Sequence, residues 1–229
     1  KRTVWNCPAD ETDIFFRWVG WAWDKLFRRS FILENDLRFQ EIQSSNDACF
    51  TYSALTLADT MSEVGSVLIA HRKRNGSIET TRGDHADNIA KAILAYRDAM
   101  IERNAFSKHP RLEIDFKKWA LHILLWHLDT IDSPVGYGKL YSAIPRLAAD
   151  IGLDRLDKSS FDASDDSWDR LSLVMKGGTI TESIRFHETL LFKRIREMTQ
   201  YKRLAQSRDY KLGNAILRIP RWLKRLVHG

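Results

Sequence analysis

The sequence predicts a mostly α-helical protein with a small mixed α/β portion at its start. Apolar residues recur every three or four positions through most of 87–203, whereas the clearest β-rich run lies before residue 83. Near the C-terminus, basic residues alternate with apolar ones. We therefore expect an α/β portion over 1–82, a helical extension over 83–204 and a basic amphipathic tail over 205–229.

The α/β portion contains one well-marked helix. Ser44, Ser45 and Asn46 are residue types that cap the first turn of a helix, and the helix is predicted over about 47–59. A shorter helix or helical turn is expected around 23–29. The run VGSVLIAHR over 64–72 is rich in β-branched residues and predicts a strand.

The remaining helices are predicted from apolar periodicity. They are expected over about 87–104, 112–130, 140–151 and 182–203, with a polar loop over 157–169. The second of them is apolar almost all round in its C-terminal half, which is typical of a buried helix. The same surface offers an interface for a homodimer.

Composition and charge narrow the class of protein. A hydrophobic content of 44% is that of a globular protein, and no run of 18 apolar residues exists that could span a membrane. Cys7 and Cys49 show no spacing typical of a disulfide framework or zinc site, so we expect a reduced, cytoplasmic protein. Because the chain begins with Lys1 rather than Met, we expect it to have been cut from a longer one.

Charge is distributed unevenly along the chain. Residues 185–229 hold twelve Lys or Arg and three Asp or Glu, a net charge of +9, so the other 184 residues carry −3 of the total +6. A basic end on a mildly acidic body indicates an anionic partner for the tail, such as a membrane surface. Nucleic acid is not the expected partner, because the tail lacks interleaved aromatic residues and a recognisable reading helix.

Three short segments follow one another in a characteristic order. They are WDKLFRRSFI at 23–32, LRFQEI at 37–42 followed by Asn46-Asp47, and VLIAHR at 67–72 followed by GSI at 76–78. Their order and spacing resemble the C-terminal, acceptor-side half of bacterial family 2 glycosyltransferases. In that family the segments read W-(N/D)-K-L, L-x-F-x-(E/N) with an acidic pair, and V-L-Y-x-Y-R.

The resemblance implies a GT-A fold and inverting transfer of a sugar from a nucleotide-sugar to a glycan or lipid-linked acceptor in surface polysaccharide synthesis. The family's donor half, with its nucleotide-binding βα unit and D-x-D motif, has no counterpart here, and Asp165-Asp166 stands in the wrong context. The nucleotide-sugar and a divalent cation (Mg²⁺ or Mn²⁺) are therefore expected in the full-length parent. This chain alone is expected to be inactive and to bind no metal.

The resemblance also implies roles for individual residues. Asp47 is the expected catalytic base, Trp23, Lys25 and Asn46 the acceptor-binding residues, and Arg72 and His71 the residues near the leaving diphosphate. The family often has an aromatic residue at the position of His71. A purely structural role stays open for Asp47, because an acidic residue at a helix start stabilises the helix by about 0.3–1 kcal/mol. Arg72 can likewise be a solvated residue at a strand end.

The tail suggests an alternative function. Its polar face carries six candidate membrane-contact residues, Lys211, Arg218, Arg221, Trp222, Lys224 and Arg225. This composition is typical of a helix lying in the membrane plane, which would place the protein at the inner face of the cell membrane. The alternative function is a non-catalytic helical module that docks on a membrane surface or a partner protein. The structural alternative is a terminal helix docked on the bundle, with a solvated basic face.

Overall fold

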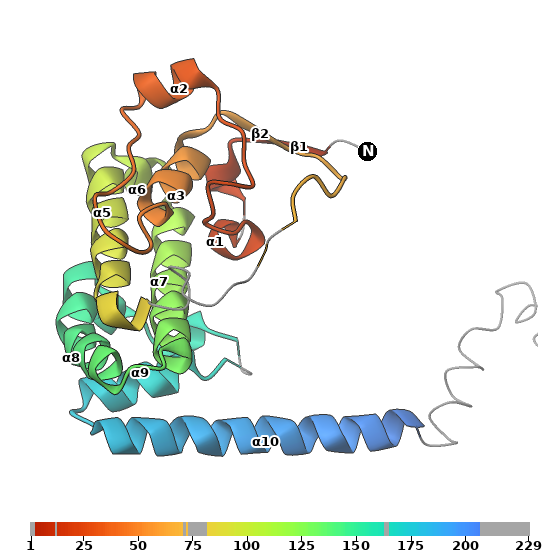
Figure 1. Ribbon diagram of the computed structural model, residues 1–229, viewed down its shortest axis with the longest axis vertical. Coiled ribbons are helices and arrows are strands. Elements are labelled where there is room, and N and C mark those ends of the chain that lie inside the picture. Colours follow the sequence, from red (N-terminus) through yellow and green to blue (C-terminus); the bar gives the residue numbers. More distant parts are fainter. Residues whose placement is uncertain (1–2, 12, 71, 73–81, 163–164, 207–229) are drawn as a thin grey trace, which may run out of the picture. The chain divides into compact units, whose positions relative to one another are not determined.

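The structure is a computed structural model that describes residues 3–11, 13–70, 72, 82–162 and 165–206 (Figure 1). The chain divides into two compact units, Lys1–Gly178 and Thr179–Gly229. Helices dominate the described residues, and the sheet within them has two strands. The expectation of a mostly α-helical protein is therefore confirmed. In this part of the chain, no helix is long and apolar enough to cross a membrane.

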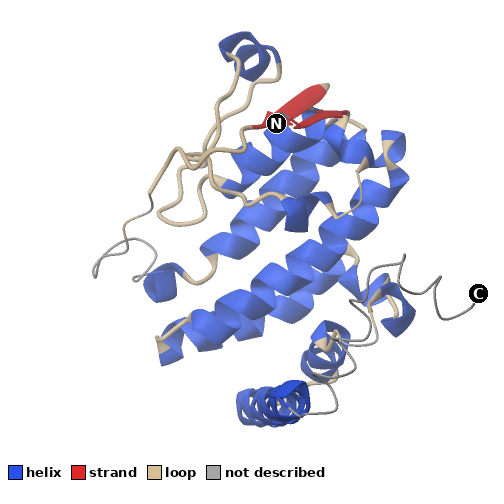
Figure 2. Ribbon diagram, turned by 90° about the vertical axis from the view of Figure 1, so that its right-hand side faces the viewer, coloured by secondary structure: helices blue, strands red, loops and turns tan. Residues whose placement is uncertain are grey.

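The first unit begins with a two-stranded antiparallel sheet. Strand β1 (Thr3–Asn6) pairs with β2 (Thr60–Glu63), and Trp5 lies opposite Met61. Figures 1 and 2 show this ribbon at one end of the unit. The segment between the two strands carries η1 (Pro8–Asp10), α1 (Ile14–Arg17), α2 (Arg29–Glu34) and α3 (Ala48–Leu57).

Helix α3 confirms the helix predicted over 47–59, but two other expectations for the N-terminal portion are wrong. Residues 21–28 form turn and loop, and a helix begins only at Arg29. Residues 64–70 form an exposed loop rather than a strand. Val67 is 95% exposed there, and among the described residues no strand pairs with this run to hold it extended, despite its high β propensity.

The helical part of the unit follows. Its elements are η2 (Arg82–His85), α5 (Asn88–Glu102), α6 (Ala105–Lys108), α7 (Pro110–Thr130), α8 (Pro134–Ile151), η3 (Leu153–Arg155), η4 (Lys158–Ser160) and α9 (Ser167–Met175). The helices predicted over 87–104, 112–130 and 140–151 are confirmed. Residues 157–169, which were expected to form a loop, include η4 and the first three residues of α9.

Local sequence explains where these helices begin and end. Proline occupies the first turn of both α7 and α8, where its missing N–H costs no hydrogen bond. The Ser133 hydroxyl accepts the Gly136 N–H at 3.1 Å and caps α8. Helix α8 ends at Gly152, whose φ of 70° favours glycine.

One aromatic cluster forms the centre of the core. Phe15 of α1 packs on Tyr96 of α5 and Trp119 of α7, with ring centroids 5.5 and 5.3 Å apart, and Tyr96 packs on Phe116 at 5.3 Å. Helices α5 and α7 run alongside each other in Figure 1. Phe15 comes from the portion before residue 83 and the others from the helices after it, so both portions share one core.

The second unit contains α10 (Ile180–Gln206), which confirms the helix predicted over 182–203. A capping box begins it: Glu182 Oε2 accepts the Thr179 N–H at 2.7 Å, and Thr179 Oγ1 accepts the Glu182 N–H at 3.2 Å. The basic tail expected over 205–229, with its six candidate membrane residues, lies outside the described residues from 207 onward.

Candidate functional site

Asp47 precedes the first residue of α3 and is partly buried. Its side chain makes no capping hydrogen bond to that helix. A purely structural role as an N-terminal cap is therefore not what its geometry shows, and the carboxylate is directed to other neighbours.

Burial raises the pKa of Asp47 above its ordinary value of 3.8. Backbone N–H groups of Asp47 itself and of Ala22 lower the pKa, as does the charge of Lys25, while the charge of Asp24 raises it. The effect of burial is the largest, so the carboxylate is more basic than an exposed one. A raised pKa brings a carboxylate closer to the range in which it acts as a general base.

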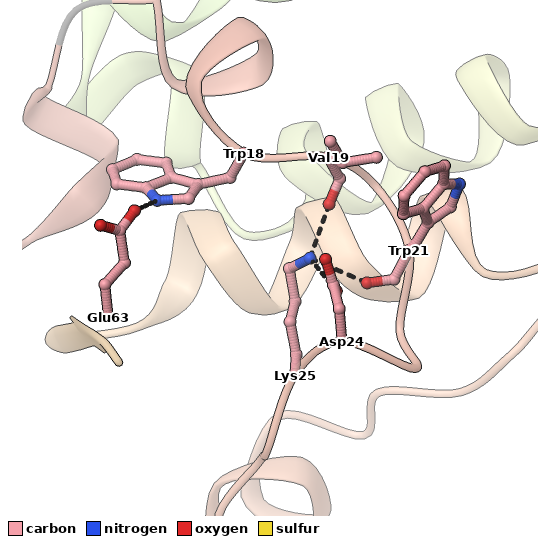
Figure 3. Close-up of polar contacts among 6 residues, drawn as sticks. All are labelled: Trp18, Val19, Trp21, Asp24, Lys25 and Glu63. Atoms are coloured by element: carbon pink, nitrogen blue, oxygen red, sulfur yellow. Dashed lines mark hydrogen bonds and ion pairs between the residues drawn. The ribbon is translucent and has the colours of Figure 1, made fainter. Parts of the chain in front are cut away.

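The neighbouring loop is organised by the Lys25 amine. Lys25 Nζ donates to the carbonyl oxygens of Val19 at 2.6 Å and Trp21 at 2.8 Å, and it pairs with Asp24 Oδ1 at 2.6 Å (Figure 3). Three partners fill the donor capacity of an ammonium group. Lys25 therefore fixes the shape of the loop that lies beside Asp47.

This loop presents an aromatic pair on the surface. Trp21 and Trp23 stack with ring centroids 4.9 Å apart and planes 21° apart, and they are 42% and 44% exposed. Flat apolar faces of this kind can pack on a sugar ring, because the ring presents C–H groups on its faces. The two tryptophans flank Ala22, whose backbone N–H acts on the Asp47 carboxylate.

The loop also packs closely on α3. A Cβ atom added to Gly20 would lie 2.6 Å from the ring of Tyr52, so only glycine fits without displacement. Burial raises the pKa of Tyr52 to about 12, and its hydroxyl donates to the Phe15 carbonyl at 3.4 Å. Trp18 Nε1 donates to Glu63 Oε1 at 3.0 Å, which joins the start of the loop to β2 (Figure 3).

The remaining predicted site residues are either exposed or outside the described residues. Asn46 is exposed, and its carbonyl accepts the Gln40 N–H at 3.2 Å. Arg72 is exposed and lies in neither a helix nor a strand. His71 lies outside the described residues. Asp47 is thus brought next to the Trp23–Lys25 loop, whereas the charges acting on its pKa do not include Arg72.

A second group of reactive side chains was not expected from the sequence. Cys7, Asp10 and His109 place their ligand atoms within 4.8 Å of one another. No local spacing pattern indicates this group, because His109 is 99 residues from Asp10 in the chain. A pocket of about 350 Å³ lies elsewhere, between α5, α6, α7 and α8, and none of the predicted site residues lines it.

Comparison of the chain with protein-family models, with curated proteins and with solved structures found no match. Among the described residues, the Ala22 backbone and the charges of Asp24 and Lys25 lie close enough to Asp47 to act on its pKa. The loop that holds these residues also exposes the stacked Trp21–Trp23 pair.

Proposed function

We propose that the first unit supplies the acceptor side of an inverting glycosyltransferase acting in bacterial surface polysaccharide synthesis. The observation that supports this function best is the carboxyl of Asp47, partly buried and with a raised pKa, beside a loop that exposes two stacked tryptophans. A general base and an apolar platform for a sugar ring are the two things that an acceptor site needs.

In the proposed reaction Asp47 takes the proton from an acceptor hydroxyl. The hydroxyl oxygen then bonds to the anomeric carbon of the donor as the bond to the nucleoside diphosphate breaks, and the diphosphate leaves with that electron pair. Trp23 holds the acceptor ring, Asn46 contributes a polar contact, and Lys25 acts by fixing the loop. Arg72 and His71 are proposed to approach the leaving diphosphate.

The proposal assigns the nucleotide-sugar and its Mg²⁺ or Mn²⁺ to residues outside this chain. Among the described residues, the one cluster with metal-ligand geometry is Cys7, Asp10 and His109. Its thiol does not suit these two ions, which prefer oxygen ligands. No step of the reaction is therefore assigned to a cation held by this chain.

The experiment is an assay of sugar transfer by a longer protein that carries this chain together with donor-binding residues. Asp47→Asn keeps the size of the side chain but removes the base, and we expect transfer to fall by roughly 10²–10⁴-fold. Asp98→Asn is the matched control, because that carboxylate is 61% exposed on α5 in the helical part. Transfer at the wild-type rate by Asp47→Asn would contradict the assignment.

A second candidate function is docking on an anionic membrane at the inner face of the cell membrane. It is favoured by α10, where Ile184, Leu191, Ile195 and Met198 are 42–58% exposed and recur at spacings of three, four and seven. The helix carries six Lys or Arg and three Asp or Glu. A basic helix with one apolar face is typical of surface binding.

Flotation with lipid vesicles tests this second function. We expect the chain to float with vesicles that contain phosphatidylglycerol and to remain at the bottom with phosphatidylcholine alone, because each basic residue near an anionic surface contributes about 1 kcal/mol. Leu191→Glu places a charge within the apolar face and should abolish flotation. Binding that is equal for both vesicle types would contradict an electrostatic role for the basic residues.

A further inference from the structure

The cluster of Cys7, Asp10 and His109 joins two distant parts of the first unit. Cys7 lies between β1 and η1, and its N–H donates to the Asp59 carbonyl at 2.7 Å. Asp10 lies in η1, and His109 immediately precedes α7. The Nδ1 atom of His109 is 2.6 Å from Asp10 Oδ1. The contact between His109 and Asp10 therefore brings the start of α7 to the segment that carries Cys7.

The arrangement does not suit a cysteine nucleophile. A thiol is activated when an imidazole takes its proton and a carboxylate orients that imidazole. Here Asp10 does bind the imidazole Nδ1, but among the described residues the Cys7 thiol makes no hydrogen bond to that imidazole, and the nearby group that acts on the thiol pKa is the Asp10 carboxylate. Burial raises the pKa of Cys7, with a smaller contribution from the Asp10 carboxylate, whereas a reactive thiol has a lowered pKa.

We propose that Cys7, Asp10 and His109 bind one Zn²⁺ ion, with the fourth position taken by water. One sulfur, one nitrogen and one oxygen ligand form a set that zinc accepts, since it binds Cys, His and Asp at about 2.0–2.3 Å. Tetrahedral bonds of that length put ligand atoms roughly 3–4 Å apart. The ligand atoms all lie within 4.8 Å of one another, with 2.6 Å between His109 Nδ1 and Asp10 Oδ1, so small side-chain rotations bring them to that arrangement.

The chemistry of the cluster selects among metals. Thiolate and imidazole favour Zn²⁺, whereas Mg²⁺ and Mn²⁺ prefer oxygen ligands. The proposed ion is therefore distinct from the cation at a sugar-nucleotide site. Its position is accessible, because the side chains of Asp10 and His109 are 65% and 21% exposed. The proposal does not depend on the glycosyltransferase function.

Zinc at this position would join the N-terminal segment to the start of α7. A neighbouring contact already links these parts, since the Asp13 N–H donates to Asp115 Oδ2 at 3.2 Å. An ion that binds the folded chain and not the unfolded one stabilises the fold by mass action. Because the ligands are 99 residues apart, the ion would also close a long loop.

The test uses the reduced full chain and Co²⁺ as a spectroscopic probe, followed by competition with Zn²⁺ against a chromophoric chelator. We expect one equivalent of Co²⁺ to give the charge-transfer band of a thiolate ligand and the visible bands of tetrahedral cobalt. One equivalent of Zn²⁺ should abolish both, and excess Mg²⁺ should leave them unchanged. Cys49→Ser, which removes the other cysteine, should behave as wild type.

Cys7→Ser should lose the charge-transfer band, and both Cys7→Ser and His109→Gln should weaken Zn²⁺ binding by more than about 100-fold, because loss of an outer partner alone costs 10–100-fold. Circular dichroism verifies that each variant is folded. Where Cys7→Ser does not fold, His109→Gln with the sulfur retained decides the question. Zn²⁺ affinity unchanged in a folded His109→Gln, or a thiolate band lost in Cys49→Ser instead, would overturn the proposal.

Discussion

The loop between α1 and α2 uses aromatic residues in the opposite way to the helices α5 and α7. Tyr96, Phe116 and Trp119 on the helices are at most 4% exposed. Trp21 and Trp23 on the loop are more than 40% exposed and pack on each other. Burying a large apolar side chain contributes about 1.5–3 kcal/mol, so the helices gain stability from their aromatics and the loop gains much less.

This difference separates scaffold from surface within one unit. The helical core positions α3, and α3 in turn places Asp47 against the loop. The loop keeps its shape through polar contacts of Lys25 and the close approach of Gly20 to Tyr52 rather than through burial. Aromatic side chains that are held in place yet exposed are a surface that a ligand can use.

The largest expected contrast is between truncations in the two regions. Phe116→Ala should lower the free energy of unfolding by about 3–5 kcal/mol, because the side chain is 1% exposed and leaves a cavity. Trp23→Ala should change it by no more than about 1 kcal/mol, as for other exposed positions. Chemical denaturation measures both changes in the free energy of unfolding. Equal losses for the two variants would mean that the loop aromatics stabilise the protein as much as the core aromatics do.

A smaller effect is expected where the loop meets α3. Gly20→Ala should destabilise the protein by about 1–3 kcal/mol, because the new methyl group overlaps the ring of Tyr52. Gly138→Ala is the matched control, since a Cβ there meets no atom within 4 Å. The same denaturation experiment applies. Unchanged stability of Gly20→Ala, at or above that of the control, would mean that the loop does not pack on α3 as described.

The smallest effect concerns the dependence of stability on pH. The folded pKa of Asp47 is raised above 3.8, so the folded protein binds the proton more tightly than the unfolded chain does. The stability that Asp47 contributes is present below that value and is lost as the pH rises through the folded pKa. Asp47→Asn should therefore be more stable than wild type at neutral pH, with the difference shrinking on acidification.

Denaturation curves for both proteins between about pH 3 and pH 7 measure this difference through the range in which a carboxylate titrates. A stability difference between the two proteins that grows on acidification would contradict this. It would indicate that folding favours the charged form of Asp47. Glu34→Gln on α2 is a useful control for the general effect of removing a negative charge.

Periodicity predicted the scaffold well, because the apolar positions of α5, α7 and α8 face one core and repeat at helical spacing. The loop was harder to predict. The residues around Trp23 favour a helix locally, but Lys25 donates to backbone carbonyls of the same segment and holds it in a turn. The run at 64–70 has strand propensity, but no strand in the part of the chain that the structure describes pairs with it.

The two candidate sites also differ in how far they could be predicted from the sequence. Asp47 was predicted from the order of the segments at 23–32 and 37–47, and Asp24 and Lys25 of the first segment do lie close enough to act on its pKa. The Cys7, Asp10 and His109 cluster depends on a contact between residues 99 positions apart. Spacing rules for metal ligands apply to ligands on one local motif, so they contain no signal for such a cluster.

The most direct test is whether a sugar binds at the loop that carries Trp23 rather than at an exposed tryptophan on the helices. The chain, and its Trp23→Ala and Trp126→Ala variants, would be titrated with a panel of bacterial surface oligosaccharides by calorimetry. Trp126 on α7 is 39% exposed, close to the 44% of Trp23, so the pair differs in position rather than in exposure. We predict that Trp23→Ala abolishes binding and that Trp126→Ala retains it. Binding that survives Trp23→Ala unchanged would contradict an acceptor site beside Asp47.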